Sequence, residues 1–308
     1  MARRANRHVK ITVSGASGFI GRRLLKTFAA GGHTMQVLSR HAGTNMPAGV
    51  KVFAWDPAKG EPPSESLQDV DAVVHLAGEP VAQRWNADVK ARIRDSRVTG
   101  TTNLVKAMAR QPRKPAVLVS SSAIGYYGSR GDEALTESST QGSDFLAEVC
   151  ADWEKSARQA EALGVRVVSI RTGHVLDPRG GLLKRILPPF RMGIGGKLGN
   201  GRQWTSWIHL DDLAAMFRFA VDQPVSGALN GVAPNPVSNT EFTRALAAAV
   251  HRPAIFPVPK LALSLLFGEM AEVILGSQRV QPERPLAAGF GFQYPELRPA
   301  LESLFRAG

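Results

Sequence analysis

The chain has 308 residues, of which 44% are hydrophobic and 21% are charged, and its formal net charge is +12. This length suits one large α/β domain or a main domain with a smaller lobe, and the composition is that of a globular protein, not a disordered one. A single cysteine, Cys150, excludes an intramolecular disulfide and a cysteine metal cluster. We therefore expect a reducing compartment, the cytoplasm, and a buried structural thiol.

The positive charge raises the question of a nucleic-acid or membrane partner. Lys and Arg are scattered, apart from the N-terminal arm and Lys90–Arg97, and no aromatic-interleaved basic motif occurs. The arm lacks the apolar core of a secretory signal. The longest apolar stretch, Leu261–Leu275, is too short to span a bilayer and is predicted to be a helix packed on its own domain, with an interfacial helix as the alternative. We expect neither nucleic-acid nor membrane partners; a basic surface that attracts an anionic cofactor or substrate explains the charge equally well.

The first apolar segment runs into three glycines. Residues Ile11–Gly21 read I-T-V-S-G-A-S-G-F-I-G and are followed by an amphipathic helical pattern. Glycines permit a tight strand-to-helix turn and let backbone N–H groups approach a pyrophosphate at the helix N-terminus. This pattern predicts a dinucleotide site.

The second apolar run ends in Ser39 and Arg40. In a dinucleotide-binding fold an acidic residue at this strand end would bind the ribose 2′-hydroxyl, whereas a basic one suits a 2′-phosphate. The sequence therefore favours NADP(H) over NAD. An arginine that is merely solvated is the alternative for Arg40.

Strand-length apolar runs recur with helical stretches between them. Continuous Val, Ile and Leu are typical of strands buried on both faces of a parallel sheet, so the alternation predicts a Rossmann-type, doubly wound α/β fold. The predicted strands are Val9–Val13, Met35–Leu38, Val50–Trp55, Ala72–Leu76, Ala116–Val119 and Val165–Ile170, and the predicted helices are Gly18–Ala30, Ala87–Arg110 and Asp144–Leu163.

After Arg171 the sequence becomes rich in loops. We expect a dinucleotide-binding domain over residues 8–230, with residues 172–212 as a substrate-side segment, and a small C-terminal lobe over residues 231–305. The stretches Gly193–Gly201 and Ser206–His209 are assigned to the substrate side. His209 is expected to hydrogen-bond a neighbouring loop, not to catalyse, and the pair Asp211-Asp212 to cap a helix beginning at Leu213. The other helices expected here are 239–250 and the apolar stretch after residue 260.

Two further strand ends carry polar or small residues. Val73–Pro80 ends in Ala77 and Gly78, which would let the backbone pass close to a cofactor ribose, unless this is an ordinary turn. Val119–Gly128 ends in serines and two tyrosines, which could bind a carbonyl or donate a proton, unless they only cap and pack.

Together these segments resemble the extended short-chain dehydrogenases/reductases of the nucleotide-sugar epimerase type. The matching motifs are S-G-A-S-G-F-I-G, H-L-A-G, S-S-S-A and W-I-H-L-D-D. More narrowly the chain resembles an NADP-dependent epimerase-like subfamily, described as nucleoside-diphosphate-sugar epimerases with a C-terminal domain of unknown function, through L-A-G-E-P, G-Y-Y-G, L-P-P-F, A-P-N-P-V and a closing G-F-x-F-x-Y-P. The resemblance extends from Ser14 to Pro295.

The resemblance implies a set of site residues. The cofactor-binding residues would be Gly15, Ser17, Gly18, Phe19, Ile20 and Gly21 at the pyrophosphate, Ser39 and Arg40 at the 2′-phosphate, Asp56 at the adenine, Leu76, Ala77 and Gly78 at the nicotinamide-side ribose, Val175 at the carboxamide, and Arg97 at a cofactor phosphate or an acidic substrate. Ser122 would be the catalytic serine.

One departure bears on chemistry. The family places a tyrosine and a lysine as Y-x-x-x-K on the helix after the serine strand, and this chain has no such motif. Tyr126 and Tyr127 are then the candidate replacements, beside water or the substrate itself. Three hypotheses remain: an NADP(H)-dependent oxidoreductase or epimerase with an altered acid/base group, a weakly catalytic NADP(H)-binding sensor or regulator, and a nucleic-acid or membrane-surface protein. No metal is expected, and the substrate and oligomeric state are left open.

Overall fold

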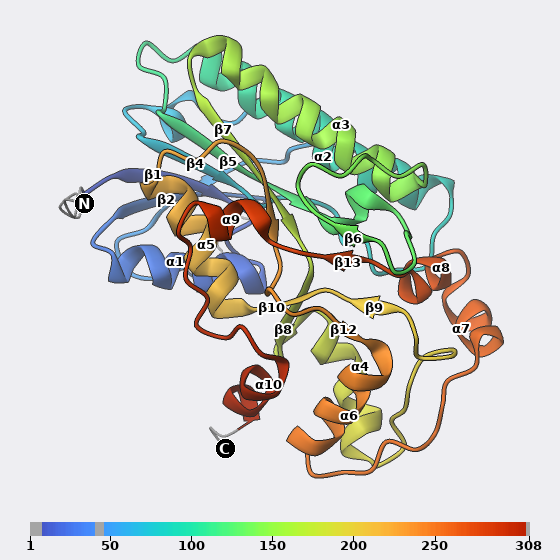
Figure 1. The fold of residues 1–308 in the computed structure, drawn as a ribbon. Helices are drawn as coiled ribbons and strands as arrows, with labels where there is room; N and C mark the ends of the chain where they lie inside the picture. The colour runs from blue at the N-terminus through green and yellow to red at the C-terminus, as the bar shows by residue number, and fades with distance from the viewer. Residues whose placement is uncertain (1–7, 41–45, 306–308) are drawn as a thin grey trace.

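The computed structural model describes residues 8–40 and 46–305, so most of the basic N-terminal arm lies outside the described residues. Within them a seven-stranded sheet forms the centre of the molecule, with all neighbouring strands parallel (Figure 1). Its spatial order is β11 (Gly227–Gly231), β7 (Arg166–Thr172), β5 (Val117–Ala123), β4 (Ala72–His75), β1 (Lys10–Ser14), β2 (Thr34–Ser39) and β3 (Lys51–Ala54). The predicted doubly wound α/β fold is confirmed.

Helices cover both faces of this sheet (Figure 1). Helices α1 (Phe19–Ala30) and α5 (Leu210–Asp222) pack on one face, and α2 (Ala87–Ala109) and α3 (Phe145–Arg158) on the other. Alternate strand residues supply the two cores: Val74 and Val119 join the α1/α5 core, whereas Val73 and Leu118 join the α2/α3 core. This period of two explains why the strands read as continuous apolar runs.

The strand order reverses between β1 and β4. The chain leaves β1 towards β2 and β3 and then returns to place β4 on the other side of β1. In doubly wound sheets the crevice beyond the carboxyl ends of such a strand pair is where ligands bind. The glycine turn after β1 and the H-L-A-G segment after β4 both lie there.

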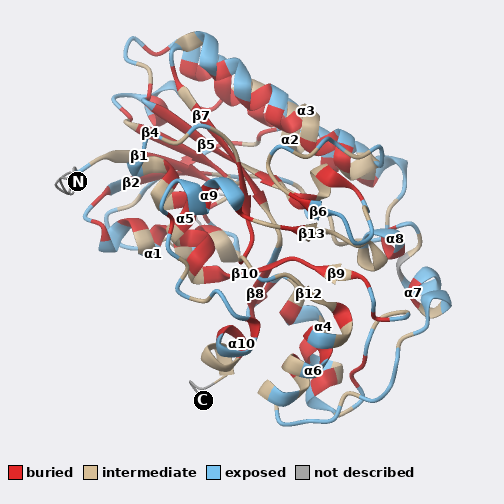
Figure 2. Cartoon of the chain, in the orientation of Figure 1, coloured by how far each residue is buried: buried red, intermediate tan, exposed pale blue. Residues whose placement is uncertain are grey.

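A third core lies beyond the carboxyl end of the sheet (Figure 2). It joins helix α4 (Gly181–Arg191) to α6 (Asn239–Ala249) and α10 (Leu297–Phe305), with Trp207 fully buried among them. Short ladders pair β8 (His174–Asp177) with β10 (Trp207–His209), β9 (Trp204–Thr205) with β12 (Val237–Ser238), and β6 (Ala134–Leu135) with β13 (Arg279–Val280). The substrate-side unit therefore draws on both parts of the chain, and a boundary at residue 230 stays a proposal.

Four local expectations are corrected. The predicted helix Leu261–Leu275 is two helices, α7 (Lys260–Phe267) and α8 (Met270–Leu275), because Gly268 between them takes a φ of +59°. Helix α5 begins at residue 210, and its cap is His209, whose Nδ1 accepts a hydrogen bond from the Asp211 backbone; the aspartates lie inside the first turn.

The third and fourth corrections concern the middle of the sheet. Strand β5 runs from Val117 to Ala123, past the predicted end at Val119, so the serines lie within the strand. Strand β11 was missed, since G-A-L-N-G holds one large apolar side chain. Short α9 (Glu283–Ala287) packs beside it. None of the helices in the described residues has both the length and the apolar content needed to cross a membrane.

Candidate functional site

The turn between β1 and α1 is built for close backbone approach. Gly15 has a φ of +69°, and a Cβ there would lie 2.8 Å from the carbonyl carbon of Leu76. A Cβ on Gly21 would lie 2.5 Å from the Cα of Ala16. Any larger residue at these two positions would force the backbone to move. Glycine therefore allows the turn to pack closely against the first turn of α1.

Helix α1 begins with no side-chain cap. Gly18 is its N-cap, and no acidic residue lies in the first turn. The early N–H groups of a helix have no intrahelical acceptor and carry the positive end of the helix dipole. Ser17, Phe19 and Ile20 line the large cavity described below, so this helix end opens onto it. The turn therefore fits a dinucleotide pyrophosphate.

Hydrogen bonds hold the two crevice segments together. The hydroxyl of Ser14 accepts from the backbone N–H of Leu76 and of Ala77 and is hydrogen-bonded to Nδ1 of His75 at 2.6 Å. His75 is fully buried, and burial lowers its pKa to about 4. The neutral imidazole thus holds the Ser14 hydroxyl, and this hydroxyl holds the H-L-A-G backbone beside the glycine turn. The resemblance places a ribose there.

The remaining predicted cofactor residues lie along the same edge of the sheet. Ser39 ends β2 and exposed Arg40 follows it. Asp56 follows β3, accepts from the backbone of Ala58 and forms an ion pair with Lys59 at 3.4 Å.

Arg97 lies behind the H-L-A-G turn. Its Nη1 donates to the carbonyl oxygens of Glu79 and Ile93, both at 3.0 Å, and its guanidinium lies over the Trp153 ring. Burial lowers the pKa of Arg97. A Cβ on Gly78 would lie 3.1 Å from its Cζ, so the turn rests on this side chain.

A cavity of about 1700 Å³ runs from the glycine turn to the substrate-side unit. Its middle is formed by the ends of β5, β7 and β8, including Ala123, Thr172 and Val175. Its far end is formed by α4, α7 and α8. Ser122, Tyr126 and Tyr127 do not line it.

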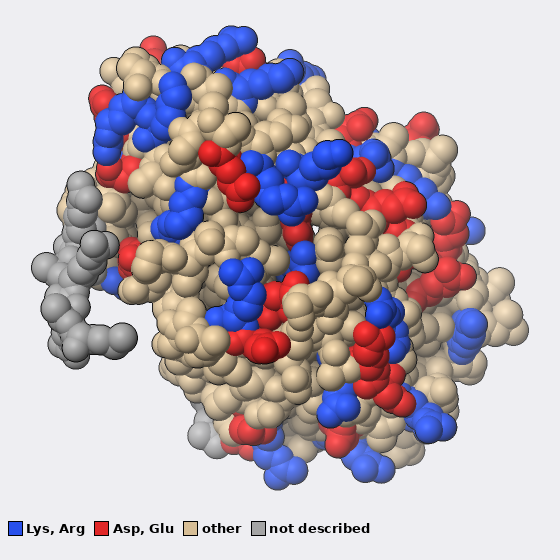
Figure 3. Space-filling model, turned by 45° about the horizontal axis from the view of Figure 1, so that its top comes forward, with Lys and Arg blue, Asp and Glu red and all other residues tan. Residues whose placement is uncertain are grey.

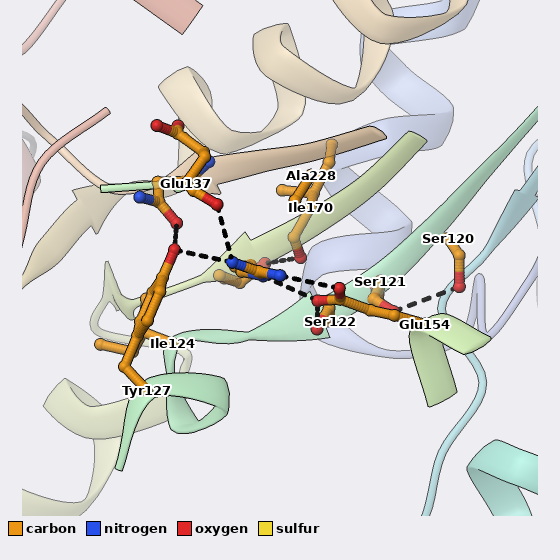
Figure 4. Close-up of polar contacts among 12 residues, drawn as sticks. Ser120, Ser121, Ser122, Ile124, Tyr127, Glu137, Glu154, Ile170 and Ala228 are labelled. Atoms are coloured by element: carbon orange, nitrogen blue, oxygen red, sulfur yellow. Dashed lines mark hydrogen bonds and ion pairs between the residues drawn. The ribbon is translucent and has the colours of Figure 1, made fainter. Parts of the chain in front are cut away.

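Ser122 points towards α3 because strand residues alternate between faces. Its hydroxyl donates to Oε1 of Glu154 at 2.7 Å, and both residues are buried (Figure 4). Glu154 also accepts from Nε and Nη2 of Arg171, at 2.8 and 2.9 Å. Burial acts to lower the pKa of Arg171, but the hydrogen bonds and the charge of Glu154 raise the pKa of Arg171 above its ordinary value.

The same network holds Tyr127. Its hydroxyl donates to Oδ1 of Asn230 at 2.7 Å and accepts from Nη1 of Arg171 at 3.0 Å (Figure 4). Burial raises the pKa of Tyr127 to about 12. The neighbouring Tyr126 is half-buried, and the guanidinium of Arg171 lies 3.4 Å from its ring centroid. The three predicted catalytic residues are therefore brought together, but around an ion pair and not in the cavity.

Sequence reasoning missed Glu154, Arg171 and His174. The register pairs Ser122 with Arg171 on adjacent strands, and alternation places both on the α3 face, so an arginine ending an apolar strand was the available signal for a buried partner. His174 lines the cavity at the start of β8, one residue before Val175. His174 is exposed at this cavity wall, and the surrounding protein lowers the pKa of its imidazole from the ordinary value. It is the only histidine among the described residues that line the cavity.

Two further groups singled out in the sequence, Cys150 and His209, are buried and pack within the protein. Cys150 is buried in α3, and burial raises its pKa to about 12, as expected of a structural thiol. His209 is buried, and its ring packs on Tyr294 with centroids 4.0 Å apart. Of the glycine-rich stretch 193–201, Gly196 and Leu198 line the cavity.

On the face that Figure 3 shows, Lys and Arg gather along the upper edge and are mixed with Asp and Glu over the rest. Many of the closest charges neutralise one another, as in Arg23 with Asp211 and Arg179 with Asp177.

Comparisons with known proteins agree with this architecture. The model of the NAD dependent epimerase/dehydratase family matches residues 11–233, and a domain of unknown function, DUF1731, matches residues 258–304. An epimerase family protein of Mycobacterium bovis is 42% identical over 94% of this chain and 96% of its own length. The chloroplastic SDR39U1 homolog of Arabidopsis thaliana is 41% identical over 96% of this chain and 86% of its own length. The crystal structure of human SDR39U1 with NADPH is 34% identical, with a TM-score of 0.87 over 97% of this chain and 99% of that one.

The fold, the glycine turn and the crevice at the strand reversal define a Rossmann-type protein of the extended short-chain dehydrogenase/reductase class. Within that class, this chain belongs to the NAD dependent epimerase/dehydratase family and carries the DUF1731 domain at its C-terminal end.

Proposed function

We propose that this chain binds NADP(H) and transfers a hydride between it and a small carbonyl or alcohol substrate in the cavity. The observation that carries the proposal is the uncapped N-terminus of α1, which opens onto a cavity far larger than the turn itself requires. The human relative crystallised with NADPH supports the choice of cofactor.

The proposed cofactor contacts follow the crevice. Gly15, Ser17, Gly18, Phe19, Ile20 and Gly21 would hold the pyrophosphate, Ser39 and Arg40 the 2′-phosphate, Asp56 the adenine, Leu76, Ala77 and Gly78 a ribose, and Val175 the carboxamide. We place Arg97 behind this site as a support for the Gly78 turn, since Nη1 is already bonded to two carbonyls.

Bound NADPH supplies the hydride, and the protein must supply a proton to the carbonyl oxygen. Tyr127 is poorly suited because its hydroxyl is fully buried and hydrogen-bonded on both sides. Ser122 donates to Glu154 instead of facing the cavity. We propose His174 as the proton donor, since it is a titratable side chain that lines the cavity next to Val175, whereas Tyr126 does not line it.

A second function, binding NADP(H) as a sensor with little turnover, is favoured by one observation. The hydroxyl of Ser122, which matches the superfamily's serine, and the hydroxyl of Tyr127, a candidate replacement for the missing tyrosine, are both tied into a buried ion-pair network here. The two functions differ in whether the cavity accepts a substrate and releases a product.

Steady-state NADPH oxidation with a panel of carbonyl compounds separates them. The enzyme hypothesis predicts turnover that rises as pH falls through a value below 6.5, and loss of that pH dependence in His174→Gln. Ser206→Ala serves as a folding control, because the Ser206 hydroxyl bonds only backbone groups. NADPH binding without turnover on any carbonyl would support the sensor.

The remaining proposals concern setting and partners. A cytoplasmic location fits the single buried cysteine, although the Arabidopsis relative is named chloroplastic. Arg22, Lys26, Lys184 and Arg185 line the cavity, which supports an anionic group on a bound molecule. Assembly into an oligomer is left to measurement by light scattering.

A further inference from the structure

The cavity has room for more than a cofactor. Its volume is about 1700 Å³, whereas pockets for one drug-sized ligand usually measure about 300–1000 Å³. One end holds the glycine turn, and the other lies between α4, α7 and α8. The far end is therefore the place for a second molecule, and its assignment to a substrate rests on the proposed function.

At this far end the side chains of α7 and α8 form an apolar wall, whereas α4 also contributes the cations Lys184 and Arg185 to the cavity lining. The side chains of α7 and α8 described as lining it are Leu263, Leu266, Met270, Val273 and Ile274. Ile186 and Phe190 of α4 add to the same wall. This wall offers no polar side chain from α7 or α8 among the residues described there.

Apolar surface also continues from the cavity to the outside. Leu266 lines the cavity and is 67% exposed, and its neighbours Leu261 and Leu265 on α7 are 71% exposed (Figure 2). Exposed leucines gathered on one short helix at a cavity mouth are unusual for a purely structural element. A molecule that enters past α7 meets the hydrocarbon side chains of these leucines.

This wall distinguishes between substrate classes. A sugar ring buried against it would leave hydroxyls without partners, and each unmade hydrogen bond costs about 1–3 kcal/mol. An apolar group gains about 25 cal/mol for each Å² that it removes from water. We propose that the α7/α8 wall at the far end of the cavity is a substrate subsite for the apolar part of a carbonyl compound, an aliphatic aldehyde or ketone, and not for the sugar ring of a sugar nucleotide.

Binding and turnover test this subsite separately. Decanal should displace anilinonaphthalene sulfonate from the protein and should accelerate NADPH oxidation, whereas UDP-glucose should do neither. Leu266→Gln combined with Val273→Thr should weaken decanal binding about tenfold by placing polar atoms in the wall, with NADPH affinity unchanged. Both positions are partly exposed, so the fold should tolerate the changes.

Leu286→Gln is the matched control, because Leu286 is 47% exposed on α9 and does not line the cavity. Equal effects of the control and the double variant would overturn the proposal, as would tighter binding of UDP-glucose than of decanal. If the unmodified protein does not bind NADPH, the proposed function is overturned instead. Displacement of the probe by decanal would then still support the apolar subsite.

Discussion

Removal of Arg171 should destabilise the protein far more than removal of a surface arginine. Its guanidinium is 5% exposed and donates to both oxygens of Glu154 and to the hydroxyl of Tyr127. The Glu154 side chain is 2% exposed. In Arg171→Leu its carboxylate would lose the partner cation and retain as partners the Ser122 hydroxyl and the more distant Arg158 at 3.8 Å. Breaking a buried pair in this way costs about 3–5 kcal/mol. Since most domains have only about 5–15 kcal/mol of stability, the loss should be large.

Urea unfolding followed by circular dichroism measures this loss. Arg130→Leu is the matched control, because its pair with Glu133 is partly exposed and is expected to be worth at most about 1 kcal/mol. The double variant Glu154→Leu with Arg171→Leu should be more stable than Arg171→Leu alone, since it leaves no unpaired charge. If Arg171→Leu unfolds at the same urea concentration as Arg130→Leu, the network is not a stabilising pair and our interpretation of Ser122 as part of it is wrong.

Three further predictions concern single side chains. Ser122→Ala should lower the free energy of unfolding by about 1.5–3 kcal/mol while leaving turnover within about tenfold, and a loss of turnover with unchanged stability would show that Ser122 acts on substrate. Cys150, with a pKa of about 12, should react with iodoacetamide at pH 8 only after unfolding, and rapid reaction of the native protein would contradict its burial. Because the pKa of His75 falls to about 4 on folding, its contribution is fully present above pH 6.5 and is lost as pH falls towards 4, by about 3 kcal/mol. An acid-induced loss of stability that is no smaller in His75→Gln would contradict this assignment.

Local signals were sufficient to predict the sheet and the glycine turn. Gly15, Gly18 and Gly21 permit a tight turn within a few residues of sequence. Buried parallel strands need apolar side chains on both faces, and this also shows in the local sequence. Elements with weak local signals were missed or misjudged. Strand β11 depends on pairing with β7 for its place, and the break between α7 and α8 depends on the positive φ of Gly268.

The setting of the serine could not be predicted because it depends on distant contacts. Ser122, Glu154 and Arg171 lie on three different elements, and only their packing shows that the hydroxyl faces α3. The same holds for the cap of α5, where His209 replaces the predicted aspartates since its ring is fixed by Tyr294 from the C-terminal part of the chain. The glycine turn can therefore be recognised from local sequence, whereas the partners of Ser122 cannot.

Calorimetric titration of NADPH and NADH into the unmodified protein and Arg40→Ala tests the central claim most directly. We predict that NADPH binds about ten- to a hundredfold more tightly than NADH, because a charge-assisted contact from Arg40 to the 2′-phosphate is worth about 1.5–3 kcal/mol. Arg40→Ala should lose this preference and keep its NADH affinity. Failure of both nucleotides to bind would contradict the account of the glycine turn, and equal affinities in the unmodified protein would contradict the assignment of NADP(H).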